Sequence, residues 1–197
     1  MRTITKNLYK FEELEDESKE RAIKNYRERN DLYFEGEMLE EDMNYKLSEY
    51  GYKNMEVNFS LTYSQGDGVA FYGTISGEDF EYWLKIHKKE FTRYELKKIK
   101  DERPFIQINI TRTSMGYHYS HYNTMDVEVY VENYEDNEVL QRIQDKIYEI
   151  VDDEIRDISK ELENQGYAYF EECQSDEYIT EDLIINEFEF DEYGHIY

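Results

Sequence analysis

The sequence is poor in cysteine and proline, and it has no long apolar run. Cys173 and Pro104 are single residues of their kind among 197. One cysteine excludes an internal disulfide framework, and the acidic residues around it disfavour the thiolate that a catalytic nucleophile needs. No apolar run reaches the length of a membrane span, and the N-terminus "MRTITKNLYKF" lacks the apolar centre of a secretory signal. We therefore expect a cytoplasmic protein without a membrane partner.

The sequence also lacks the motifs of common enzyme classes. It contains no phosphate-binding Walker loop, no dinucleotide fingerprint, no Gly-x-Ser-x-Gly elbow and no His-Glu-x-x-His helix. Pairs of carboxylates are frequent, but in a chain with 47 acidic residues they carry no information about acid–base catalysis. We therefore expect no catalytic residues and no cofactor.

Positive charge is scarce and unevenly placed. The chain has 23 basic residues against 47 acidic ones, which gives a net charge of −24. After Lys160 there is no further Lys or Arg, whereas the stretch from 161 to 197 carries twelve acidic residues. The reverse holds between Lys85 and Arg103, where eight basic residues face four acidic ones. Such a field repels nucleic acid and anionic membranes, and it favours basic partners.

The two charged stretches have several interpretations. Charge runs are most often solvated faces of helices. Alternatively they bind a partner, or they pair with each other within the fold or across a homodimer. We expect a partner-binding acidic surface to include Asp152, Asp153, Asp157, Glu171, Glu172, Asp176 and Glu177. The stretch Lys85–Arg103 is the segment through which nucleic acid would bind, against the sign of the net charge.

What the sequence has in abundance is aromatic residues. Its 21 Tyr and 10 Phe supply the buriable area that disordered acidic chains lack. The length suits one sizeable core, so we expect a single domain over 1–197.

The spacing of apolar residues predicts the order of the elements. An extended arm over 3–11 leads to a helix from about 15 to 29 and to a second helix whose apolar face is Phe34, Met38, Leu39, Met43 and Leu47. Alternation over 55–63 and 69–75 predicts a hairpin with "QGDG" at its tip, and alternation over 106–110 and 125–131 predicts another. A helical region over 77–103 separates the two hairpins. An apolar stripe from Leu140 to Leu162 predicts a long helix, and "NEFEFDEYGHIY" a short terminal hairpin or extended tail.

Together these elements predict an α+β fold. We expect a mostly antiparallel sheet of four or five strands, helices packed on one face, and a long helix in the C-terminal half.

Two loops carry the candidate binding residues. In "SQGDG", residues 64–68, the glycines allow positive φ and Asp67 can bond local backbone, which is a purely structural explanation. The competing interpretation is a small polar site made by opened backbone amides beside Gln65 and Asp67. The spacing of acids does not fit a calcium loop.

The second loop is "SMGYHYSHYNTM", residues 114–125. Two histidines three residues apart, without a third ligand, are a weak zinc signal, so we expect no metal. Tyr117, Tyr119 and Tyr122 favour a contact surface, because Tyr offers a large amphipathic area at low entropic cost. If both hairpins point the same way, one end of the sheet gathers the candidate site: Gln65, Asp67, Tyr117, His118, His121, Tyr122 and Thr124.

Four segments give a resemblance that spans nearly the whole chain. "LYKFEELEDESKERAIKNYRERN", "SQGDGVAFYG", "HYNTMDVEV" and "NEFEFDEYG" resemble a group of small phage and prophage proteins often labelled antitoxin of a toxin–antitoxin stability system. "SQGDG" followed by Phe is the most specific of these motifs. The sequence departs from the pattern at Glu15, where a Ser or Thr cap is expected. The resemblance implies a phage origin and an accessory role in the host cytoplasm, and it implies no site residues.

An acidic, tyrosine-rich phage protein without catalytic motifs favours one function class. We expect a non-enzymatic inhibitor of a host defence system, of the anti-CRISPR type, which binds a basic, nucleic-acid-handling host protein as a mimic of nucleic acid. The alternatives are an antitoxin that neutralises a cognate toxin, and an RNA-binding or small-ligand-binding accessory protein.

Overall fold

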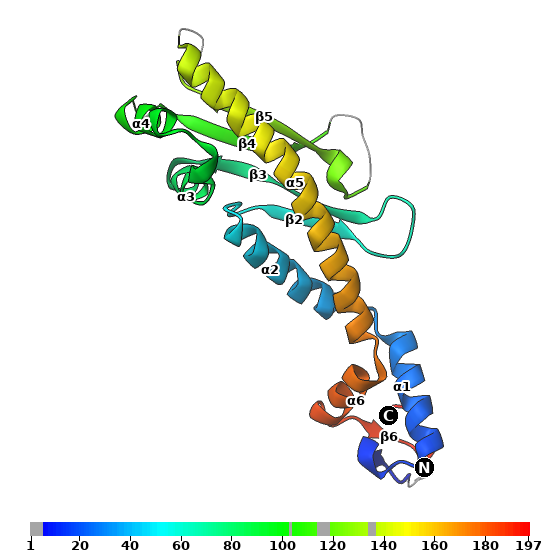
Figure 1. Ribbon diagram of the computed structural model, residues 1–197. Helices are drawn as coiled ribbons and strands as arrows, with labels where there is room; N and C mark the ends of the chain where they lie inside the picture. Colours follow the sequence, from blue (N-terminus) through cyan, green and yellow to red (C-terminus); the bar gives the residue numbers. More distant parts are fainter. Residues whose placement is uncertain (1–5, 103, 114–118, 134–136) are drawn as a thin grey trace, which may run out of the picture. The chain divides into compact units, whose positions relative to one another are not determined.

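A computed structural model describes residues 6–102, 104–113, 119–133 and 137–197 (Figure 1). The chain divides into two compact units. Unit 1 comprises Met1–Glu37 and Tyr167–Tyr197, and unit 2 comprises Met38–Gly166. The expectation of one domain over the whole chain stays a prediction. Within the described part of the chain, no helix has both the length and the apolar character needed to cross a bilayer.

Unit 2 is built on a four-stranded antiparallel sheet. The strands are β2 (Glu56–Ser60), β3 (Gly68–Ser76), β4 (Ile106–Arg112) and β5 (Met125–Val131), in the order β2-β3-β4-β5. The register pairs Val57 with Phe71 and Ile108 with Val129. Alternate residues such as Ile108 and Ile110 are buried, while their neighbours Asn109 and Thr111 are not. The predicted α+β class and both hairpins are therefore confirmed.

Helices cover the apolar face of this sheet. They are α2 (Tyr33–Glu49, which starts in unit 1), α3 (Gly77–His87), α4 (Arg93–Glu102) and α5 (Glu138–Cys173). Figure 1 shows α5 running across the strands, and the Ser159 hydroxyl donates a hydrogen bond to the carbonyl of Val69 in β3. The predicted long helix is confirmed, because its stripe from Leu140 to Leu162 is buried almost throughout. It is longer than expected and ends only at Cys173.

The helical region expected over 77–103 is two helices joined by a 3-10 turn, Lys88–Glu90. The break has a local cause at Thr92. Its hydroxyl accepts a hydrogen bond from the Glu95 backbone N–H, and the Glu95 carboxylate accepts one from the Thr92 backbone N–H at 2.7 Å. This reciprocal cap starts a new helix at Arg93.

Two other expectations, for β2 and for α2, were wrong in detail. The strand expected over 55–63 ends at Ser60, because Thr62 and Ser64 donate their N–H groups to the side chain of Asp67 instead of to a neighbouring strand. In α2, Leu39, Met43 and Leu47 are buried, but Phe34 and Met38 are exposed. A helix turns by about 100° per residue, so Phe34 and Met38 fall on the side of the helix opposite to Leu39, Met43 and Leu47.

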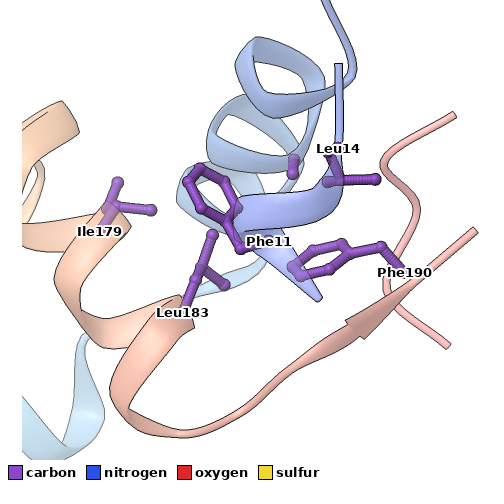
Figure 2. Close-up of a cluster of buried hydrophobic side chains, with 6 residues drawn as sticks. Phe11, Leu14, Ile179, Leu183 and Phe190 are labelled. Carbon is purple, nitrogen blue, oxygen red and sulfur yellow. The ribbon is translucent and has the colours of Figure 1, made fainter. Parts of the chain in front are cut away.

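Unit 1 combines the two ends of the chain. Its elements are β1 (Tyr9–Lys10), a 3-10 turn (Phe11–Glu13), α1 (Asp16–Arg29), α6 (Asp176–Ile185) and β6 (Glu189–Phe190), with β1 and β6 antiparallel. Phe190 also bridges to Ile196, which confirms the terminal hairpin. Figure 2 shows the side chains that close the small core; together with Ala22 they are Phe11, Leu14, Ile179, Leu183 and Phe190. Helix α6 was not expected.

Candidate binding surface at the hairpin tip

The turn between β2 and β3 is organised by Asp67. Its carboxylate accepts hydrogen bonds from the backbone N–H groups of Thr62 and Ser64 and from the hydroxyl of Ser60 at 2.9 Å. The Asp67 backbone N–H donates to the carbonyl of Ser64. One side chain thus satisfies several donors that the end of β2 leaves unpaired, as an Asx-type turn does. Asp67 therefore bonds local backbone, as the structural interpretation of the turn predicts.

The loop before β5 packs directly on this turn. A Cβ placed on Gly66 would lie 2.5 Å from the ring of Tyr119, and one placed on Gly68 would lie 2.6 Å from the Cβ of His121. Gly66 has φ +95° and Gly68 has φ +153°, which other residues rarely adopt. The two glycines therefore serve both the chain reversal and the close approach of residues 119–121. The expected convergence of the two hairpins is confirmed for the residues that the structure describes.

Thr124 holds the loop before β5 in place from its buried side. Its side chain is fully buried, and its hydroxyl donates to the carbonyl of His121 at 2.7 Å and lies 3.1 Å from the hydroxyl of Tyr72. Its backbone carbonyl accepts from the N–H of Thr113 beyond the end of β4. Thr124 was expected on the surface, but its burial makes it a support for the surface.

Aromatic rings cover the exposed side of the loop. Tyr119 is 50% exposed and Tyr122 is 40% exposed, and the ring of His121 lies beside both rings. The centroid distances are 6.5 Å from Tyr119 to His121, with nearly parallel rings, and 5.8 Å from His121 to Tyr122. The Nδ1 atom of His121 accepts from the N–H of Asn123, which places the proton of the neutral ring on Nε2. We call Gln65, Tyr119, His121 and Tyr122 the hairpin-tip surface.

Arg112 joins this surface without having been expected there. One guanidinium nitrogen donates to the carbonyl of Tyr119 at 3.4 Å, and the guanidinium lies 5.8 Å from the centre of the Tyr72 ring. No sequence signal pointed to Arg112. Its place at the end of β4, opposite Met125 of β5, follows from the register of the sheet. Tyr117 and His118 lie outside the described residues. Within the described ranges, no group of three or more His, Cys, Asp and Glu side chains is placed to hold a metal ion.

A family model described as "Domain of unknown function (DUF8835)" matches residues 36–176, which is more than half of the chain. The chain belongs to this family. The matched region contains the whole of unit 2 and therefore the hairpin-tip surface of this DUF8835 member. No curated protein and no solved structure matches the chain.

A second polar cluster of the DUF8835 chain lies inside unit 2. The Nδ1 atom of His87 is 2.8 Å from the carbonyl of Trp83, and its Nε2 atom is 2.9 Å from the carboxylate of Glu154, which also accepts from the hydroxyl of Tyr52. Burial by itself lowers the pKa of His87, but its hydrogen bonds to Glu154 and to the Trp83 carbonyl outweigh that effect and raise it. Burial raises the pKa of Tyr52 well above its usual value.

This cluster is a structural clamp. Both ring nitrogens of His87 face acceptors, so the protonated ring satisfies both, and it stacks on Trp83 at 4.2 Å. The ion pair between His87 and Glu154 connects α3 to α5. No sequence signal distinguished His87 from its basic neighbours.

The expected acidic surface is divided between the units. Asp152, Asp153 and Asp157 belong to unit 2, whereas Glu171, Glu172, Asp176 and Glu177 belong to unit 1. Asp152 pairs with Arg156, and Asp176 pairs with Arg27. Asp153, Asp157, Glu172 and Glu177 are exposed and, within the described part of the chain, form no ion pair.

Cys173 does not resemble a nucleophile. Its side chain is buried, and this burial raises the pKa of the thiol. A thiol held in its protonated form is a poor nucleophile.

Proposed function

We propose that this protein is a phage-encoded, non-enzymatic inhibitor of a host defence system, of the anti-CRISPR type. It binds a basic, nucleic-acid-handling host protein through the hairpin-tip surface, and its exposed carboxylates steer the encounter. The proposal rests on the resemblance to phage and prophage proteins and on the composition of the surface.

One observation carries this proposal. The partly exposed rings of Tyr119 and Tyr122 both lie beside the ring of His121, on a loop that Thr124 and the two turn glycines hold in place. Aromatic side chains that are ordered before binding lose little entropy when a partner covers them, and Tyr dominates many protein interfaces. Exposed aromatic rings also suit pockets that normally receive stacked bases.

Capture from a lysate of the host bacterium tests the proposal. Three forms of the full chain serve as bait: wild type, Tyr119→Ala with Tyr122→Ala, and a control with Tyr45→Ala and Tyr148→Ala. The control residues are exposed tyrosines of unit 2 on α2 and α5, so it loses the same number of rings away from the hairpin tip. Wild type and control should retain the same nucleic-acid-handling protein, and the Tyr119/Tyr122 variant should lose it.

Two results would contradict the proposal. Equal capture by all three forms would remove the hairpin tip from the interface. Capture of a toxin encoded beside the gene would show that the protein is an antitoxin and not an inhibitor of a defence system.

A further inference from the structure

Helices α3 and α4 and the start of β4 border an open apolar groove in unit 2. Its volume is about 640 Å³. Phe105 is 48% exposed in this groove, and its ring lies 6.3 Å from that of Tyr130, which is also exposed. The other apolar residues that line it are Phe80, Leu84, Leu96, Ile99 and Ile106. Burial of such a surface against an apolar partner is favourable, because apolar area is removed from water.

Uncompensated positive charge lies along the groove. Lys100 lines it, and Arg93 and Lys97 precede Lys100 at spacings that place all three along one side of α4. Within the described residues, five exposed cations of this region form no ion pair: Lys85, Lys88, Arg93, Lys97 and Lys100. Glu81 and Glu132 also line the groove, and the Glu132 carboxylate accepts from the Phe105 N–H at 3.2 Å. These two carboxylates cannot neutralise all five cations, so most of the basic charge stays without a partner.

Helix α6 of unit 1 presents the complementary chemistry. Its inner face is buried through Ile179 and Leu183. Its outer face combines the exposed acids Glu177 and Glu181 with Ile184 and with Ile185, which is 76% exposed. Exposed isoleucines beside carboxylates are complementary to an apolar groove that has cations beside it, because the apolar areas can pack together and the opposite charges can pair.

We propose that the outer face of α6 from a second copy of this chain docks in the groove between α3 and α4. Because each chain carries both the groove and the helix face, two copies can exchange these contacts around a two-fold axis. The isoleucines contribute apolar burial, and the charge pairs set orientation and encounter rate. RNA is the other anionic occupant to consider, but a phosphate backbone would satisfy the cations and leave the apolar lining uncovered.

Charge exchange in the full-length chain tests this dimer. The groove variant is Lys97→Glu with Lys100→Glu, and the helix variant is Glu177→Lys with Glu181→Lys. Matched controls are Arg142→Glu with Lys160→Glu, and Glu12→Lys with Glu20→Lys, which make the same changes of net charge at other exposed positions. Sedimentation velocity over a range of protein concentrations gives the dissociation constant of the dimer.

The expected result is a concentration-dependent dimer of wild type and of both controls. Each charge variant alone should raise the dissociation constant at least tenfold, because like charges then face each other in both contacts. An equimolar mixture of the two variants should dimerise again, since each reversed surface meets its reversed counterpart. Ile185→Ser should weaken the dimer without changing its salt dependence.

Three results would overturn the inference. They are a wild-type chain that stays monomeric at every concentration, a dimer that the charge variants leave unchanged, and a groove whose variants lose RNA binding but not self-association. None of these results depends on Tyr119 or Tyr122. The dimer can therefore be disproved while the proposed function stands, and the proposed function can be disproved while the dimer stands.

Discussion

At the scale of single residues, the two loops at the hairpin tip and the local bonding of Asp67 were predicted from the sequence, but the roles of Thr124 and Arg112 were not. Gly and Asp mark a turn because their backbone preferences are local. Whether a side chain points into that turn or out of it depends on neighbours that are distant in sequence. Thus Asp67 and Thr124 support the surface from inside, while Arg112 reaches it from β4.

Asp67→Ala should lower the free energy of unfolding by about 1–3 kcal/mol, since it leaves two backbone donors and the Ser60 hydroxyl without their charged acceptor. Urea denaturation of the full chain measures this. Asp153→Ala removes an exposed carboxylate of α5 and should change stability by less than about 0.5 kcal/mol. Equal stability of Asp67→Ala and wild type would show that the turn does not depend on its carboxylate.

His87 gives a pH prediction with a definite sign. Its folded-state pKa is raised above the usual 6.5, so its contribution to stability is fully present below that value and is lost as pH rises through the folded-state pKa. The difference in free energy of unfolding between wild type and His87→Gln should therefore be larger at about pH 5.5 than at about pH 9. A difference that is constant, or that grows with pH, would mean that the ring is not held as the cation between Trp83 and Glu154.

At the scale of elements, strands and long helices could be predicted because burial of one face leaves a repeat in the sequence. The apolar stripe of α5 and the alternation of β4 are examples. Helix α6 was missed because it exposes Ile184 and Ile185 as well as its acids, so its apolar residues follow no single stripe. The hydroxyl of Ser175, which accepts from the N–H of Tyr178, was the available signal for its start.

Helix starts also give a prediction. Helix α1 begins after Glu15, whose side chain makes no capping hydrogen bond, whereas α4 and α6 begin with Thr92 and Ser175 as caps. Glu15→Ser should stabilise α1 by about 0.5–1 kcal/mol and slow its amide hydrogen exchange about two- to fivefold. Glu12→Ser removes the same charge three residues earlier and serves as the control. Unchanged exchange in Glu15→Ser would show that α1 is held by packing alone.

At the scale of the whole molecule, composition predicted the sign of the charge but not its arrangement. The seven acidic positions expected to form one surface fall in two compact units, and Lys100 of the basic stretch lines an apolar groove. The division into units was not visible in the sequence, because both α2 and α5 run without a break from one unit into the other. The family match spans unit 2 and ends at the first residue of α6.

The central claim is that an ordered aromatic surface on an acidic chain binds a basic host protein. The most direct measurement is the affinity for the captured partner of wild type and of the Tyr119→Ala, Tyr122→Ala variant, each at low and high salt. The account predicts that wild-type affinity falls at least about tenfold between about 50 and 500 mM salt, and that the variant binds weakly at both. An affinity that neither salt nor the loss of the two rings changes would contradict it.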